Sequence, residues 1–411
     1  MDNQNVSSLD KCLACDSIKL SPVLDLGEQP LANSFKKNAR DKEEKYPLAI
    51  NKCDYCFHVQ LSHIVDPEII YKDYAYVSGT SDTMRKHFEW FARWSVEYYK
   101  LTNRNEHFRV LDIGCNDGSQ LDAYKALDSK IITFGVDPAE NLFPVSSEKG
   151  HKITCSMFDA NFVRGLQSYE ILVAQNVFAH QKNPLAFLQC AKQSMHYNSL
   201  LFIQTSQADM IRNAEYDTIY HEHISFYNIN SMNRLCNRAG MKLVDVIKCP
   251  LHGNSYIFVL RTELGRPNHI DNLIDMEKDL LRHETYVEYA DRCHDHMENI
   301  HSIIEKYRKN FYPIVGYGAA AKGNTLINSA NLYFDCIIDD NPLKQGKFTP
   351  GANIPVFNSG MLEYHKSPVL FVPLAWNFFD EIKSKIKAKR PYAQLGKDFF
   401  LRVNPKIEVI Q

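Results

Sequence analysis

The sequence lacks the features that would place the protein in a membrane or outside the cell. No apolar run reaches the length of about 20 residues that a membrane-spanning helix needs. The N-terminus, MDNQNVSSLDK, has neither the basic region nor the apolar region of a secretory signal. We therefore expect a cytoplasmic protein with no membrane partner.

A strong charge of either sign is also missing. The formal net charge is -2 at pH 7, with 47 lysines and arginines against 49 acids. Proteins that bind nucleic acid through its phosphates carry a surplus of basic residues, so we expect no nucleic-acid partner. The 411 residues, 45% of them hydrophobic, are enough for two or three globular domains.

The cysteines do not suggest a disulfide framework, because their number, 11, is odd and most are isolated. The exception is two CxxC pairs, Cys12 with Cys15 and Cys53 with Cys56. Two turns that each present two thiolates complete a tetrahedral zinc site with no open position. We predict a structural zinc ion that holds together a strand-poor segment; coincidence or redox chemistry is the alternative for a single pair. Between the pairs, Leu24–Phe35 shows turn residues and no clear period.

A pattern of alternating strands and helices starts near residue 106. This alternation predicts an α/β fold with a parallel, doubly wound sheet. Strands are predicted at 108–113, 131–137, 169–176, 200–206 and 252–260, and helices at 84–101 and from Pro184.

The first of these strands runs into the turn Asp112-Ile-Gly114-Cys-Asn116-Asp-Gly118. Glycines there let the backbone approach a ligand at the carboxyl edge of the sheet. The next strand ends in Asp137, at a spacing that suits a carboxylate bound to the hydroxyls of a ribose. A NAD-binding turn would read GxGxxG, whereas this DxGxxxG turn resembles motif I of the class I methyltransferases that use S-adenosylmethionine (SAM).

The densest group of acid and base side chains is the segment Glu215–Tyr227, EYDTIYHEHISFY. It follows the predicted strand 200–206, so we expect it at the carboxyl edge of the sheet, where ligands bind. Histidine titrates near neutral pH and can take up and release a proton. The histidines are two residues apart, not four as in HExxH, so a zinc-protease site is excluded. A solvated polar loop is the alternative.

A second glycine-rich unit begins near residue 312, after a charged helical connector at 274–308. It reads Pro313-Ile-Val-Gly316-Tyr-Gly318, then Ala-Ala-Ala-Lys322, and strands are predicted at 336–340 and 369–377. A strand–turn–helix junction of this kind can bind a phosphate. The alternative is that the glycines serve only tight packing.

Together, the CxxC pairs, DIGCNDG, YHEHISFY and GYGAAAKGNTL resemble the nucleotide-sugar C-methyltransferases. The resemblance implies a zinc-binding domain at 1–70, a SAM-binding domain at 71–270 and a Rossmann-like domain at 271–411. It also implies a nucleoside-diphosphate 4-keto-6-deoxy sugar as the substrate, methylated at C-3, with TDP or GDP as its carrier. We expect a monomer or weak homodimer.

Site residues follow from the same resemblance. His223 resembles the general base and Glu222 its partner, which would hold the imidazole ring; the other catalytic candidates are Tyr220, His180 and Tyr76, with Tyr74 a less favoured choice. The methyl donor would bind Asp112, Gly114, Asn116, Gly118, Asp137 and Asn176. The substrate would bind His252, Asn254, Gly316, Gly318, Lys322 and Asn324. Asn254 departs from the HGGS found in related proteins, which bears on the lining of the sugar pocket.

The implied reaction starts from an enolate. The C-4 ketone makes the C-3 proton acidic, His223 removes it, and tyrosine or histidine donors stabilise the oxyanion. Two other functions are compatible with parts of the sequence. One is a SAM-dependent methyltransferase of a non-sugar small molecule, with a regulatory C-terminal domain. The other is a zinc-ribbon interaction module with a degenerate enzyme core, against which the intact Asp112, Gly114 and Asp137 argue.

Overall fold

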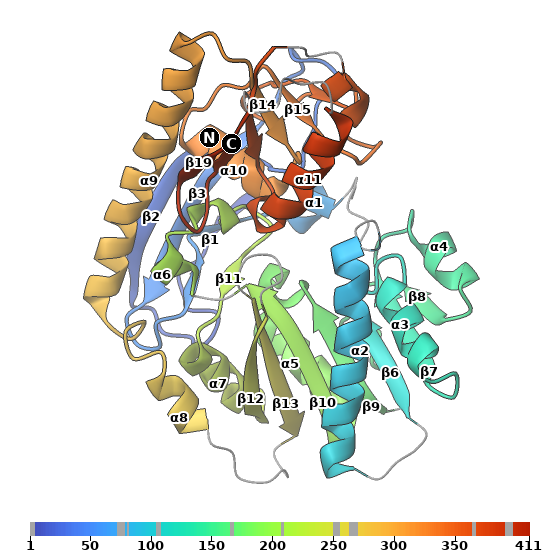
Figure 1. Ribbon diagram of the computed structural model, residues 1–411. Coiled ribbons are helices and arrows are strands. Elements are labelled where there is room, and N and C mark those ends of the chain that lie inside the picture. Colours follow the sequence, from blue (N-terminus) through green and yellow to red (C-terminus); the bar gives the residue numbers. More distant parts are fainter. Residues whose placement is uncertain are drawn as a thin grey trace.

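The computed structural model describes residues 5–71, 79, 82–103, 108–164, 168–206, 209–249, 255–262, 270–363, 367–390 and 398–411. These residues form a mixed α/β fold with one larger sheet towards each end of the chain and one in the middle (Figure 1). Two of the three sheets are mainly parallel and one is antiparallel.

The antiparallel sheet contains the second CxxC pair and has the strand order β11-β4-β3-β2. Its strands are β2 (Leu20–Pro30), β3 (Lys45–Cys53), β4 (Val59–Leu61) and β11 (Ser225–Phe226). A two-stranded ribbon, β1 (Val6–Ser8) with β5 (His63–Val65), and the short helix α1 (Pro67–Tyr71) complete this part of the chain. The expectation of a strand-poor segment is wrong. Leu24–Phe35 begins inside β2, whose bulges opposite β3 hide the strand period.

The middle sheet has the order β12-β13-β10-β9-β6-β7-β8. Its strands are β6 (Arg109–Ile113), β7 (Ile132–Asp137), β8 (Lys152–Cys155), β9 (Tyr169–Gln175), β10 (Met195–Ser206), β12 (Met241–Cys249) and β13 (Ser255–Thr262). The sheet is not fully parallel as predicted, because β13 pairs antiparallel with both β10 and β12. A doubly wound arrangement is confirmed by the helices on both faces (Figure 1).

Alternate residues of the central strands supply two separate cores, as the strand period of two requires. Val110 and Val173 pack towards α2 (Asp82–Thr102) and α3 (Ser119–Leu127). Leu111 and Ala174 pack towards the opposite face, which is covered by α5 (Pro184–Gln193) and α7 (Ile229–Arg238). The smaller helices are α4 (Phe143–Glu148), α6 (Met210–Asn213) and α8 (Ile270–Asp275). Because the helices cover both faces of the sheet, ligands are expected to bind at its carboxyl edge.

The third sheet has the order β16-β15-β14-β17-β18-β19. Its strands are β14 (Ile314–Tyr317), β15 (Cys336–Ile338), β16 (Val356–Phe357), β17 (Leu370–Pro373), β18 (Phe399–Arg402) and β19 (Glu408–Ile410), with helices α10 (Ala321–Ser329) and α11 (Phe379–Lys389). The long helix α9 (His283–Lys309) runs along β2 and up to this sheet (Figure 1). Leu48, Tyr289 and Ile337 belong to one apolar cluster, so the N-terminal sheet, α9 and the C-terminal sheet share a core.

Candidate active site

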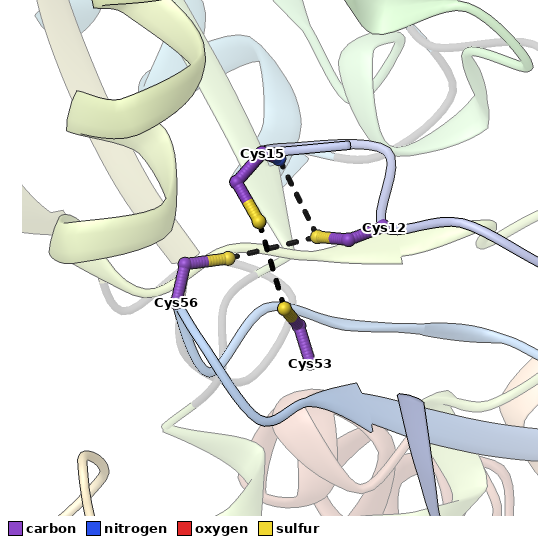
Figure 2. A group of neighbouring side chains, drawn as sticks. All are labelled: Cys12, Cys15, Cys53 and Cys56. Carbon is purple, nitrogen blue, oxygen red and sulfur yellow. Dashed lines mark hydrogen bonds between the residues drawn. The ribbon is translucent and has the colours of Figure 1, made fainter. Parts of the chain in front are cut away.

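The four cysteines of the CxxC pairs form one cluster (Figure 2). All four Sγ atoms lie within 4.8 Å of one another, and the Cys12–Cys56 and Cys15–Cys53 pairs are each 3.6 Å apart. Four sulfurs around a zinc ion at the usual bond length are about 3.8 Å apart. The cluster therefore fits a structural zinc ion with no open position.

The turn after β6 has the backbone that a close ligand requires. Gly114 has φ 76° and Gly118 has φ 77°, both in the left-handed region that glycine favours. A Cβ added to Gly114 would lie 2.3 Å from Cγ2 of Val177, so no other residue fits beside the end of β9. Asn116 and Asn176 also have positive φ, 50° and 56°, and the Asn176 amide donates to the Gln204 carbonyl at 2.8 Å.

Acidic side chains give this edge its charge. Asp137 ends β7, and its carboxylate accepts hydrogen bonds from the amides of Asn116 and Ala139, each at 2.9 Å. Each oxygen retains acceptor capacity for a ribose hydroxyl. Burial, with the charges of Asp137 and Asp117, raises the pKa of Asp112 to about 8. A cationic ligand offsets that repulsion, whereas the phosphates of a dinucleotide would add to it. The edge therefore fits SAM, a sulfonium, better than it fits NAD.

The segment Glu215–Tyr227 is not a solvated loop. Every one of its residues is buried except Tyr220, which is half-buried. It begins with a 3-10 turn, Tyr216–Thr218, ends in strand β11, and leads into α7. Its side chains reach all three sheets of the chain, as the following contacts show.

Of the two histidines in this segment, His221 and His223, His223 has more hydrogen-bond partners. Its Nδ1 lies 2.9 Å from the Thr218 carbonyl and 3.4 Å from the Ser206 hydroxyl, at the end of β10. Because a carbonyl only accepts, Nδ1 carries the proton, and Nε2 keeps its lone pair. The Tyr220 hydroxyl lies 2.7 Å from this Nε2. The ring is therefore held with its second nitrogen towards a phenol.

His180 lies beside this pair, in the 3-10 turn Phe178–His180 that follows β9. The ring centroids of His180 and His223 are 5.3 Å apart, and those of Tyr220 and His223 are 4.0 Å apart. Burial lowers the pKa of His180 to about 4, so its imidazole is neutral at physiological pH. Three of the predicted catalytic side chains are thus in one group.

Glu222 does not hold the His223 ring, contrary to the expectation from sequence. Its Oε1 instead accepts a hydrogen bond from Asn33 Nδ2 at 2.6 Å. Burial raises the pKa of Glu222, while the Asn33 hydrogen bond and the charge of Lys344 oppose the rise. Residues 220–223 form a turn, closed by a hydrogen bond of 2.8 Å from the His223 amide to the Tyr220 carbonyl, and the Thr218 carbonyl has taken the position expected for the carboxylate.

His221 makes an inward, structural contact. It is 2% exposed, and its Nε2 lies 3.3 Å from the carbonyl of Tyr46 in β3. Burial lowers its pKa to about 4, so it stays neutral. The three consecutive residues from His221 to His223 therefore point to three different sets of partners.

The second glycine-rich turn makes more internal contacts than the sequence suggests. Asn324 is 2% exposed and donates to the Ala32 carbonyl at 2.6 Å, so its amide links α10 to the N-terminal segment. A Cβ on Gly316 would meet Leu374 Cδ1 at 2.9 Å, which is a packing constraint. Gly318 has φ 88°, and Lys322 places Nζ 5.0 Å from the centre of the Trp376 ring.

The contact between the segment and the C-terminal sheet is a hydrogen bond of 2.6 Å from Trp376 Nε1 to the Asp217 carboxylate. Sequence reasoning missed Asn33, Thr218 and Trp376, because none lies in a motif and two act on residues far away in the chain. Tyr74, Tyr76, His252 and Asn254 lie outside the described residues.

No helix in the described ranges has the length and apolar composition to cross a bilayer.

Three family models match successive parts of the chain. They describe a zinc binding domain at residues 12–71, a methyltransferase domain at 85–246 and a C-methyltransferase C-terminal domain at 250–403. The C-methyltransferase NovU of Streptomyces niveus is 26% identical over 420 residues, which cover 98% of each chain.

Solved structures resemble the chain over less than half of its length. The plantazolicin methyltransferase BpumL in complex with SAH is 16% identical, with a TM-score of 0.37 over 44% of this chain and 86% of that chain. A SAM-dependent methyltransferase from Archaeoglobus fulgidus is 15% identical, with a TM-score of 0.36 over 43% and 94%. The three family models in this order, together with the full-length similarity to a C-methyltransferase, support a SAM-dependent C-methyltransferase.

Proposed function

We propose that the enzyme methylates C-3 of a nucleoside-diphosphate 4-keto-6-deoxy sugar. Carbon attacks a methyl sulfonium only as a carbanion or enolate, so a C-methyltransferase for such a sugar needs a base. The observation that carries the proposal is the hydrogen bond of His223 Nδ1 to the Thr218 carbonyl. It fixes the proton on Nδ1, so that Nε2, beside the Tyr220 hydroxyl, can act as the base in a buried segment at the carboxyl edge of the sheet.

His223 Nε2 would take the C-3 proton, and the resulting enolate would attack the methyl group that SAM supplies. Tyr220, whose hydroxyl lies at Nε2, would move its hydrogen bond to the developing C-4 oxyanion. The burial of the segment around them excludes water, which protects the enolate from simple reprotonation. The nucleoside diphosphate would lie against the turn at Gly318 and Lys322, and TDP or GDP fits this role equally.

A second candidate is a non-sugar small molecule as the substrate. The commitment of Asn324 to Ala32, and the packing of Gly316 against Leu374, favour it, because both remove groups expected to bind a nucleotide. In that case, the C-terminal sheet would complete the active site without binding the carrier.

The decisive experiment incubates the enzyme with SAM and a TDP- or GDP-linked 4-keto-6-deoxyhexose. We expect a product heavier by one methylene than the substrate, with a deuterium label placed at C-3 of the substrate lost to water through the base. The variant His223→Asn, which can still donate to Thr218, should bind SAM normally and lose turnover. No reaction with either nucleotide sugar would favour the second candidate, and turnover by His223→Asn would move the base to His180.

A further inference from the structure

Gln60 connects the first CxxC turn, through its side chain, with strand β11 of the active-site segment, through its backbone. Its side chain is fully buried in β4. Its Oε1 accepts from the Leu13 amide at 2.9 Å, and its Nε2 donates to the Lys11 carbonyl at 3.0 Å. Leu13 lies between Cys12 and Cys15, so one amide side chain holds the first CxxC turn from both sides.

The main chain of Gln60 lies between the two strands that matter for this site. Its neighbour on one side is Asn51 of β3, the strand that ends at Cys53. Its neighbour on the other side is Ser225 of β11. Strand β4 therefore lies between the strand that carries Cys53 and the strand that belongs to the active-site segment.

Ile224 continues this connection to both histidines. Its carbonyl accepts from the Leu61 amide at 2.9 Å, and its amide donates to the Ala179 carbonyl at 2.8 Å. Ile224 directly follows His223, and Ala179 directly precedes His180. Ile224 therefore connects β4 to the backbone beside both imidazole rings.

Further contacts fix the far end of the same segment to the second CxxC turn. His58 Nε2 lies 3.2 Å from the Ser225 hydroxyl, and Asn228 donates to the Phe57 carbonyl at 2.6 Å. Asn230, in α7, donates to the Cys56 carbonyl at 3.1 Å. The segment that follows His223 is thus attached to the metal-binding turns over its whole length.

We propose that Gln60 is a positioning residue for His223, through which the geometry of the four-cysteine site sets the orientation of the base. The proposal rests on His223 acting as the base. A catalytic group has to be held within about 0.5 Å of its working position by its supporting residues. Loss of the Gln60 hydrogen bonds would free β4 from the first CxxC turn and let β11 shift, and His223 with it. If the hydrogen bonds of Gln60 served only to satisfy its own buried amide, their loss would lower the stability of the protein without moving His223.

The test follows the imidazole itself, by nitrogen NMR of the zinc-loaded enzyme with labelled histidine. The signal of His223 is assigned from its loss in His223→Asn. We expect Gln60→Ala, and Gln60→Met with nearly the same volume, to shift this signal. Both should release zinc to a chelator about tenfold faster. Ser21→Ala is the matched control, because Ser21 bonds Asp54 in the second CxxC turn from β2, the strand farthest from β11. It should leave the His223 signal unchanged.

Metal removal from the wild-type enzyme gives an independent arm, which stands even if the Gln60 variants fail to fold. Chelation should shift the His223 signal in the same direction as Gln60→Met. With an accepted substrate, kcat should fall about tenfold while KM and SAM affinity change less than twofold. An unchanged His223 signal in Gln60→Met and in metal-free enzyme overturns the proposal. A shifted signal without any methylation of a nucleotide sugar leaves it standing and contradicts the proposed substrate instead.

Discussion

The hydroxyl of Tyr220 lies 2.7 Å from Nε2 of His223, whose other ring nitrogen bonds the Thr218 carbonyl. When the imidazole is neutral, the phenol is the donor in this pair and Nε2 the acceptor. A substrate that reaches Nε2 has to replace this hydrogen bond, and the released phenol becomes available to an oxygen nearby. In the proposed reaction, this one contact prepares both the base and the oxyanion donor.

Tyr220→Phe should separate these two roles. It removes the donor and leaves the Nδ1 hydrogen bond of His223, so we expect kcat to fall by about 100-fold with SAM affinity unchanged. Steady-state kinetics and calorimetry measure the two quantities. Tyr197→Phe, at a tyrosine 68% exposed, is the control and should behave as wild type. A Tyr220→Phe enzyme with normal kcat would exclude the phenol from the reaction.

The stability of the ligand-free enzyme should depend on Asp112. Its pKa rises from an ordinary 3.8 to about 8 through burial and the nearby Asp137 and Asp117. An acid with a higher pKa in the folded protein takes up a proton on folding, so this contribution to stability falls as the pH rises from about 4 to 8. Asp112→Asn should remove that fall and raise the melting temperature at pH 8, while weakening SAM binding about tenfold.

Thermal melts between pH 5 and 9, with and without SAM, measure this effect. Asp295→Asn, at an exposed acid of α9, serves as the control and should retain the wild-type pH dependence. A parallel pH profile of Asp112→Asn and wild type would contradict the assignment.

Removal of one zinc ligand should destabilise the protein strongly. Cys53→Ser takes one sulfur from the cluster, and we expect the bound zinc to be lost and the free energy of unfolding to fall by about 4 kcal/mol or more. Metal analysis and chemical denaturation test this. Cys155→Ser is the matched control, since Cys155 is exposed and lies outside the cluster. Full zinc content in Cys53→Ser would exclude this sulfur as a ligand.

Trp376→Phe should weaken the attachment of the C-terminal sheet. The change removes the donor to Oδ2 of the buried Asp217 carboxylate, whose Oδ1 has no hydrogen-bond partner among the described residues. A buried acceptor left unpaired costs about 1–3 kcal/mol, which denaturation curves resolve. Trp90→Phe, at a tryptophan 43% exposed, should cost much less. Equal losses in the two variants would show that ring volume, and not the hydrogen bond, matters at Trp376.

Local sequence patterns were sufficient for the elements that carry their own signal. The strand period and glycine turns predict β6, β7 and β9 to within one residue, because buried parallel strands are apolar throughout and end at sharp turns. The two CxxC pairs predict the sulfur cluster, since each turn brings its own two ligands together.

Contacts between distant segments could not be predicted in this way. Strand β11 has only two residues, and nothing in Ser225 or Phe226 indicates that β4 is its partner. The contact of Asn33 with Glu222 could not be predicted either, because the two residues are 189 positions apart in the sequence. Strand β2 was also missed, because its bulges break the alternation of apolar and polar residues that marks a strand.

The pairing of β11 with β4 bears on how the chain folds during its synthesis. Residues 59–61 leave the ribosome long before residues 225–226, so the nascent N-terminal sheet has an open edge until β11 has been made. An open edge invites pairing with another chain, and such intermediates aggregate. Early zinc capture by the first 56 residues would make this edge rigid while it waits for its partner strand.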